Sequence, residues 1–129
     1  MIVARGNEIA VEGPAEEVEK ATRVMKDLLS VLRDGNPISS RDARYAIQLV
    51  KEGEPVTLHE LLSDVIQVTA RGRQIRPKTL GQKRYVDAIR KNGIVFAIGP
   101  AGTGKTYLAM AMAIAALKEK EVARIILTR

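Results

Sequence analysis

The sequence contains no cysteine and no tryptophan, and its aromatic side chains are limited to three tyrosines and one phenylalanine. The absence of cysteine excludes disulfide bridges and thiolate metal sites, and it is compatible with a reducing compartment. With so few aromatic rings, a hydrophobic core must be built from aliphatic side chains. The longest apolar run, 107–117, is too short to cross a bilayer, and no secretory signal pattern follows Met1. We therefore expect a cytoplasmic protein with no membrane partner.

The composition is that of a globular protein with an uneven charge distribution. The 129 residues are 46% hydrophobic and 28% charged, which is enough for one domain or for one incomplete domain with an appended segment. The net charge is +6, and the window 71–91 carries eight basic residues against the single acid Asp87. Such a cluster attracts nucleotide or nucleic-acid phosphates, and a solvated basic face without a partner is the alternative.

The most specific motif is a glycine-rich stretch made of Gly99, Pro100, Ala101, Gly102, Thr103, Gly104, Lys105 and Thr106. It matches G-x-x-x-x-G-K-[ST], the pattern of the phosphate-binding (Walker A) loop of P-loop nucleoside triphosphatases. The apolar residues 94–98 before it predict a buried strand. Residues 107–120 after it contain no glycine or proline and predict a helix. Strand, glycine loop and helix form the arrangement that such a loop requires.

These residue types suit the binding of a nucleoside triphosphate and Mg²⁺. Glycines let the backbone approach a ligand closely, and the loop N–H groups form an anion nest with the positive end of the following helix. Lys105 is predicted to reach the β- and γ-phosphates and to stabilise their charge in catalysis, and the Thr106 hydroxyl to ligate Mg²⁺. The alternative is a glycine turn that binds nothing.

Gln82 is the candidate for recognition of the base. It lies 23 residues before Lys105, in a turn that precedes a helix predicted over 83–91. A side-chain amide pairs bidentately with the adenine edge, donating to N7 and accepting from the N6 amino group. Several helicase-like ATPases use a glutamine in a comparable upstream position, and this resemblance implies that Gln82 contacts adenine and favours ATP over GTP. An ordinary polar helix cap is the alternative.

Local patterns predict the remaining elements. Alternating apolar residues predict hairpins over 2–12, turning at Gly6-Asn7, and over 65–76, turning at Arg71-Gly72, with Ile66, Val68 and Ile75 inward. Helical spacing predicts helices over 15–33 and 39–53 and a short turn over 58–62 with Thr57 and Glu60 as its capping box.

Two further predictions concern a second buried strand and the single histidine. Residues 123–129 are apolar and β-rich, and a strand–helix–strand crossover of this length is normally parallel and right-handed. His59 is a candidate for a metal or catalytic role, but a lone histidine in a short turn favours a surface or capping role.

Three runs, 75–86, 99–109 and 124–129, closely resemble the phosphate-starvation-inducible (PhoH-like) ATPases, and residues 5–33 and 42–47 are similar to the corresponding region of that family. The resemblance implies an ATP-binding domain related to the superfamily 1 helicase core, with a role in RNA metabolism. Residues 7–33 also resemble the last part of a K-homology (KH) module, a small RNA-binding fold. A purely structural strand–helix unit is the alternative.

The fold class that follows is α/β: a truncated, helicase-like P-loop NTPase with a parallel sheet, preceded by a small α+β KH-like segment. We predict a partial KH-like strand–helix segment over 1–36, a helical connector over 37–64, and the N-terminal part of the nucleotide-binding domain over 65–129. An incomplete sheet leaves apolar faces exposed, which favours self-association into a homo-oligomer or poor folding.

Hydrolysis is not expected of this chain by itself. Members of the PhoH-like family, which this sequence resembles, continue past the segment 125–129 into a Walker B acidic strand. We therefore expect this chain to be a piece of a longer ATPase. Hydrolysis needs a carboxylate to hold Mg²⁺ and a group to orient the attacking water, and no acid here follows a predicted buried strand. We therefore expect ATP binding without turnover.

Two other functions fit parts of the sequence. The first is an RNA-binding module in which the basic window 71–91 contacts RNA or single-stranded nucleic acid. The second is another phosphoryl-transfer enzyme, such as a kinase, which keeps the glycine loop but has no recognisable acceptor site.

Overall fold

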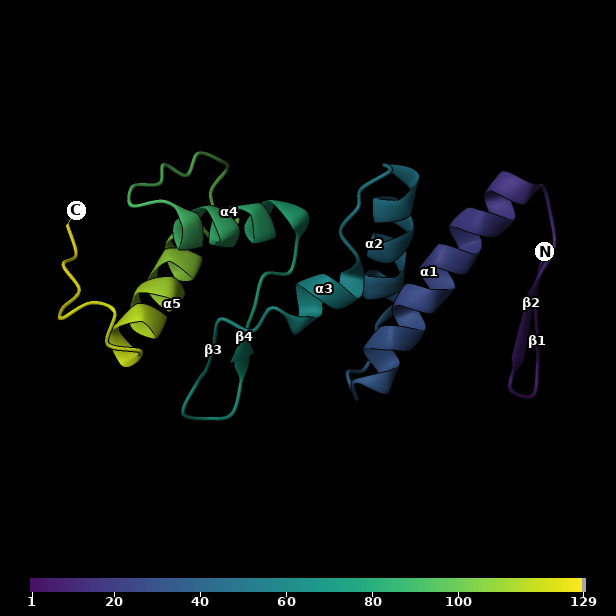
Figure 1. Cartoon of the computed structure of the whole chain (residues 1–129), viewed down its shortest axis with the longest axis horizontal. Helices are drawn as coiled ribbons and strands as arrows, with labels where there is room; N and C mark the ends of the chain where they lie inside the picture. Colours follow the sequence, from purple (N-terminus) through teal and green to yellow (C-terminus); the bar gives the residue numbers. More distant parts are fainter. Residues whose placement is uncertain (129) are drawn as a thin grey trace. The chain divides into compact units, whose positions relative to one another are not determined.

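A computed structural model describes residues 1–128 as a series of helices and short hairpins. Its elements are β1 (Ile2–Arg5), β2 (Glu8–Val11), α1 (Ala15–Arg33), α2 (Ser40–Lys51), α3 (Leu58–Ser63), β3 (Gln67–Val68), β4 (Gln74–Ile75), α4 (Leu80–Lys91) and α5 (Lys105–Lys118) (Figure 1). The chain divides into two compact units, Met1–Glu60 and a second that begins at Leu61. Among the residues described, none of the helices combines the length and the apolar character needed to pass through a membrane.

The first unit opens with the predicted hairpin, which is confirmed. β1 and β2 are antiparallel, and their register pairs Arg5 with Glu8, so Gly6 and Asn7 form a two-residue turn. Gly6 has a φ of 57°, whereas Asn7 has no positive φ. A positive φ at the first turn position alone is typical of a type II′ turn, which matches the twist of the flanking strands.

Helices α1 and α2 pack together and supply most of the buried side chains of this unit. The buried aliphatic residues on their facing sides are Val24, Val31, Ala46 and Leu49. Helix α1 has the predicted bounds, and Gly35, two residues after its end, has a φ of 76°. The Asn36 N–H donates to the Val31 carbonyl over 3.2 Å. This geometry is typical of a glycine-terminated helix, in which the left-handed residue lets the chain turn back onto the last carbonyls.

Asp27 connects α1 to the start of α3. Its side chain is buried, with 8% exposed, and accepts hydrogen bonds from the backbone N–H groups of Leu58 (2.8 Å) and His59 (2.9 Å). The predicted capping box is also confirmed: the Thr57 N–H donates to Glu60 and the Glu60 N–H donates to the Thr57 hydroxyl. Asp27 therefore satisfies two backbone donors that the short helix α3 cannot pair by itself.

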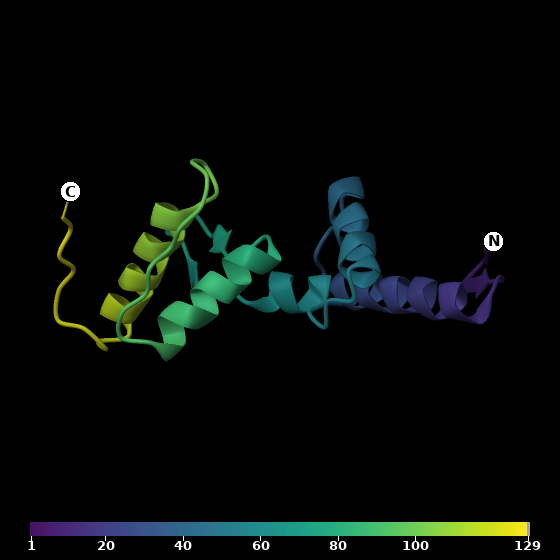
Figure 2. The same cartoon turned by 90° about the horizontal axis from the view of Figure 1, so that it is seen from above.

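The core of the second unit lies between the β3–β4 hairpin and the helices α4 and α5, which lie side by side (Figure 2). Its buried members are Ile66, Ile75, Val86, Leu108 and Ala111. The hairpin is antiparallel and pairs Gln67 with Ile75 and Val68 with Gln74.

Val68, predicted to point inward, is 48% exposed, so that part of the prediction is wrong. The strand β3 ends at Val68, and the turn to β4 begins at the next residue, where the Thr69 carbonyl accepts from the Gly72 N–H. The inward face of this short hairpin is therefore limited to Ile66 and Ile75, both of which are buried.

The predicted buried strand over 94–98 is not formed. Figures 1 and 2 draw this segment as a loop, and Ile94, Phe96 and Ile98 are 80%, 89% and 99% exposed. Residues 124–128 are likewise not a strand, and Arg129 lies outside the described residues. Across 1–128 both sheets are two-stranded and antiparallel, so the predicted parallel sheet is absent there. The physical reason is that an extended segment is stable only beside a hydrogen-bonded neighbour, which neither segment has among these residues.

We expect Asp27→Ala to destabilise the first unit by about 2–4 kcal/mol, because it removes the charged acceptor of two backbone donors at a buried position. Urea denaturation followed by far-UV circular dichroism measures the change. The matched control is Glu17→Ala, which removes an exposed acid of the same helix and should change stability by less than about 0.5 kcal/mol. Equal stability of the two variants would contradict the proposed role of Asp27.

Candidate functional site

The glycine loop leads directly into α5, and two of its glycines have a backbone conformation that other residues rarely adopt. Gly102 has a φ of 77°, and Gly104, the N-cap of α5, has a φ of 87°. Side chains are strained in this left-handed region, so both positions require glycine. Helix α5 therefore begins at Lys105, two residues before its predicted start, and ends at Lys118.

The Lys105 ammonium group lies against the loop that precedes it. Its Nζ atom donates to the carbonyl oxygens of Gly99 (2.9 Å) and Pro100 (2.5 Å) and to the Thr103 hydroxyl (3.2 Å). The Thr103 hydroxyl in turn donates to the Pro100 carbonyl over 2.8 Å. The loop is thus braced from inside by one cation, which also places a positive charge at the start of α5.

Gln82 lies beside this loop although it is 21 residues from Thr103 in the sequence. The Thr79 hydroxyl accepts from the Gln82 N–H and caps α4, so the helix begins at Leu80 and not at 83 as predicted. The Gln82 Oε1 atom accepts from the Lys78 N–H over 2.7 Å, and its Nε2 atom donates to the Thr103 carbonyl over 3.1 Å.

A pocket of about 510 Å³ adjoins the loop, between the first turns of α4, residues 95–98 and the start of α5. This volume is within the usual range for small-molecule sites. Of the predicted site residues, its lining contains Gln82, Gly99, Pro100, Thr103 and Lys105. The other four, Ala101, Gly102, Gly104 and Thr106, lie outside the lining, and the Thr106 side chain is exposed in the first turn of α5.

The structure also locates the candidate metal-binding residues. Within the described part of the chain, no group of three or more histidine, aspartate or glutamate side chains is placed to hold a metal ion. His59 belongs to the first unit, where its Nε2 atom lies 2.6 Å from Asp34 Oδ2 and its backbone N–H is held by Asp27.

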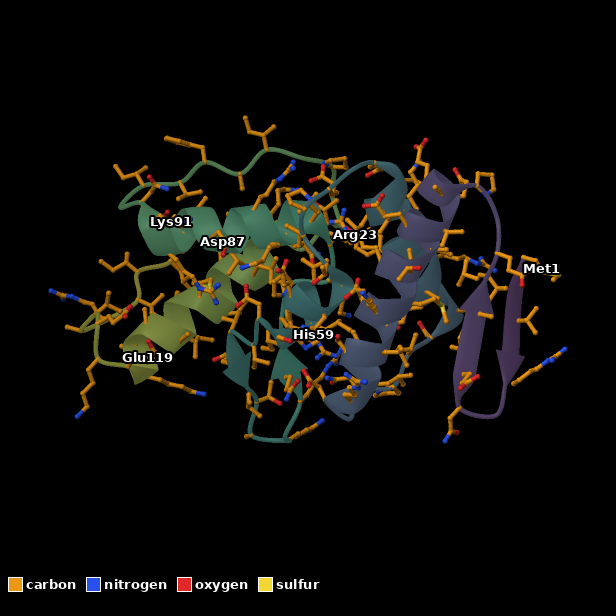
Figure 3. All side chains as sticks on the ribbon, turned by 45° about the vertical axis from the view of Figure 1, so that its right-hand side comes forward. Met1, Arg23, His59, Asp87, Lys91 and Glu119 are labelled. Atoms are coloured by element: carbon orange, nitrogen blue, oxygen red, sulfur yellow. The ribbon has the colours of Figure 1, made fainter. Side chains whose placement is uncertain are left out.

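An ion-pair network that the sequence analysis missed fixes the position of α4. Asp64, between α3 and β3, receives two hydrogen bonds from Arg90, at 2.7 and 2.9 Å, and one from the Lys83 ammonium at 2.8 Å. Lys83 also contacts Asp87 on the same helix. Asp87 is labelled on α4 in Figure 3. The i,i+4 spacing of Lys83 and Asp87 is visible in the sequence. Asp64 has no such signal, because it is 26 residues from Arg90.

This network has two consequences for the predicted site. The hydrogen bond from Arg90, followed by that from Lys83, lowers the pKa of the Asp64 carboxyl below its ordinary 3.8, although partial burial opposes the shift. In addition, at least two basic side chains in the window 71–91, Lys83 and Arg90, are engaged by acids of the chain itself. The positive charge of this window is therefore partly offset by neighbouring groups.

The described residues form a mixed helical and small-sheet fold, consistent with the α/β class. The sequence is similar to the PhoH-like proteins. A family model described as "PhoH-like protein" matches residues 74–129, the region that contains Gln82, the glycine loop and α5.

Relatives from several bacteria match nearly the whole chain. It is 45% identical over 128 residues to a PhoH-like protein of Bacillus subtilis, with 99% of this chain and 40% of the relative covered. It is 48% identical over 126 residues to one of Mycobacterium leprae, covering 97% and 36%, and 34% identical over 119 residues to Protein PhoH of Escherichia coli, covering 91% and 31%. The chain thus spans two fifths or less of the length of these relatives. No solved structure matches it.

We expect Asp64→Asn to lower the free energy of unfolding by roughly 1–3 kcal/mol at pH 7, because it removes the charged acceptor of Arg90 and Lys83. A carboxyl whose pKa is lowered by folding stabilises the protein above its unfolded pKa, and this contribution is lost as pH falls through the folded value. The difference between wild type and variant should therefore shrink as pH falls below 3.8.

Urea denaturation at a series of pH values between 7 and 2 measures this difference. The matched control is Glu121→Gln, which replaces an exposed acid of the same unit. Its free energy of unfolding should stay close to that of wild type at every pH. A difference for Asp64→Asn that is the same at pH 7 and at pH 2 would show that the paired carboxylate is not its source.

Proposed function

We propose that this chain binds a nucleoside triphosphate through residues 99–106, with ATP as the preferred nucleotide and Mg²⁺ as its counter-ion. The observation that carries the proposal is the Lys105 ammonium, held within hydrogen-bonding distance of the Gly99 and Pro100 carbonyls where α5 begins. A glycine loop, a lysine and a helix N-terminus then converge on one place, and together they suit a triphosphate.

Each part of the loop has a separate task in this proposal. The first N–H groups of α5 have no intrahelical acceptor, because the first bond of this helix runs from the Leu108 N–H to the Gly104 carbonyl. These donors and the helix dipole hold the phosphates. Lys105 releases its loop carbonyls, turns toward the phosphate oxygens and stabilises their charge, and the exposed Thr106 hydroxyl is available to Mg²⁺.

Gln82 is the residue proposed to read the base. Its carboxamide offers two N–H donors and two acceptor lone pairs. The bonds to Lys78 and Thr103 use one acceptor position and one donor. The remaining acceptor and donor are the pair that the N6 amino group and N7 of adenine require. Guanine presents an oxygen in place of the N6 amino group, so this arrangement favours ATP over GTP.

The activity of the longer protein is a further part of the proposal. The Bacillus subtilis and Mycobacterium leprae relatives are between two and three times as long as the matched region, so residues that complete a hydrolytic site have room beyond it. We propose that the longer protein hydrolyses ATP with a carboxylate and a water-orienting group supplied from outside residues 1–129, and that its substrate is connected with RNA metabolism.

We expect Lys105→Ala to abolish ATP binding, because it removes the only loop cation and one internal brace of the loop. Isothermal titration calorimetry with Mg-ATP measures the affinity of wild type and variant. Lys118→Ala is the matched control, since it removes an exposed lysine from the last turn of the same helix and should leave the affinity unchanged. Equal ATP affinity in Lys105→Ala and wild type would overturn the assignment of the loop.

RNA contact is a second candidate, favoured by the exposed β3–β4 turn, where Arg71 and Arg73 flank Gly72. Both side chains are solvent-exposed, and guanidinium groups on a turn can reach phosphates. We expect the affinity for a single-stranded RNA to fall steeply as the salt concentration rises. In the double variant Arg71→Ala/Arg73→Ala, the slope of log affinity against log salt concentration should decrease by the equivalent of about two phosphate contacts. Fluorescence anisotropy at several salt concentrations measures both. Absence of binding at low salt, or an unchanged slope, would contradict this candidate.

A further inference from the structure

The Gln82 carboxamide joins two segments that are far apart in the sequence. It accepts from the Lys78 N–H ahead of α4 and donates to the Thr103 carbonyl within the glycine loop. The loop lies so close that a Cβ atom at Gly104 would come within 3.2 Å of Gln82 Nε2. We infer that Gln82 is a positioning residue of the phosphate-binding loop, in addition to reading the base. This inference deepens the proposed function and rests on it.

Thr103 is the point of the loop at which such a bond has most effect. Its hydroxyl donates to the Pro100 carbonyl and accepts from the Lys105 ammonium, so those two bonds stay within the loop. Its carbonyl instead bonds to α4. The Gln82 bond therefore attaches the loop to a neighbouring helix, whereas the Lys105 bonds only brace the loop against itself.

The planarity of the peptide bond explains how this bond directs a donor. In a trans peptide the C=O and N–H groups point in opposite directions. Because Gln82 holds the Thr103 carbonyl toward α4, the N–H of the same peptide, which belongs to Gly104, is directed away from α4. Gly104 has a φ of 87° and no side chain to restrict its backbone. A hydrogen bond from outside the loop is therefore needed to keep the Gly104 N–H in one direction.

The helix that carries Gln82 is itself held in place. Lys83, the next residue, and Arg90, two turns further along α4, both bond to the largely buried Asp64 carboxylate. A rigid support of this kind is what a positioning residue needs if it is to fix a loop and not move with it.

The inference separates two roles of Gln82 that ATP alone cannot distinguish. A residue that only reads adenine contributes nothing to a ligand without a base, whereas a residue that positions the loop contributes to every ligand of the loop. Inorganic tripolyphosphate carries the phosphates without base or ribose, so it is the probe for the positioning role.

The test measures binding of Mg-ATP and of magnesium tripolyphosphate by calorimetry to the whole chain and to Gln82→Ala. We expect Gln82→Ala to weaken tripolyphosphate roughly tenfold, the usual effect of one lost hydrogen bond, and to weaken ATP by more. Gln82→Glu keeps the acceptor for Lys78 but turns an oxygen toward the Thr103 carbonyl, so it should weaken tripolyphosphate at least as much. Wild-type tripolyphosphate affinity in both variants would overturn the inference.

Thr79→Ala is the matched control. It removes the cap of α4 at the same turn but keeps the Gln82 side chain. Its tripolyphosphate affinity should stay near that of wild type. If Thr79→Ala weakened tripolyphosphate as much as Gln82→Ala, fraying of α4 would explain the effect and the inference would be overturned.

Amide hydrogen exchange of the ligand-free protein supplies a readout that needs no nucleotide. We expect exchange over 101–106 to be faster in Gln82→Ala than in wild type and in Thr79→Ala, with the exchange of α1 unchanged. If wild type bound neither ATP nor tripolyphosphate, the proposed function would fail, and the exchange measurement would still decide the positioning role. Unchanged exchange in Gln82→Ala would overturn that role even if ATP binds.

Discussion

The hydrogen bond from the Gln82 amide to the Thr103 carbonyl is the contact on which the candidate site depends. On one side it is supported by α4, which Asp64 holds through Lys83 and Arg90. On the other side it meets a loop that the Lys105 ammonium braces from inside. A short series of polar contacts thus leads from a largely buried carboxylate to the lysine of the glycine loop. Polar networks of this kind specify one geometry because each lost bond leaves a group unpaired.

The chain is shorter than the PhoH-like proteins to which it is similar, and it exposes two apolar segments. The chain matches two fifths or less of the length of the relatives described above. Residues 94–98 and 124–128 have apolar side chains that point into solvent, and none of the other described residues pairs with their backbones. The glycine loop nevertheless has its left-handed glycines and its lysine contacts in place, because those depend on residues within six positions of each other and on α4.

Elements with local causes were predicted well from the sequence. The bounds of α1, the Gly6-Asn7 turn and the Thr57–Glu60 capping box all depend on residues within a few positions of one another, and all are confirmed. The loop glycines were predicted for the same reason. Predictions that needed a distant partner did worse: the strands over 94–98 and 123–128 and the inward position of Val68 were wrong, and the pairing of Asp64 with Arg90 was missed.

The sequence by itself determined the helices, the turns and the chemical character of the glycine loop, because spacing, caps and backbone freedom are properties of neighbouring residues. Only the tertiary structure decided that Gln82 lies against Thr103, that Asp64 supports α4, and that two apolar segments do not form strands. These outcomes depend on which groups meet across 20 or more residues, or on whether a neighbouring strand is present. Neither can be read from local spacing, because hydrogen bonds and ion pairs between distant segments leave no periodic pattern in the sequence.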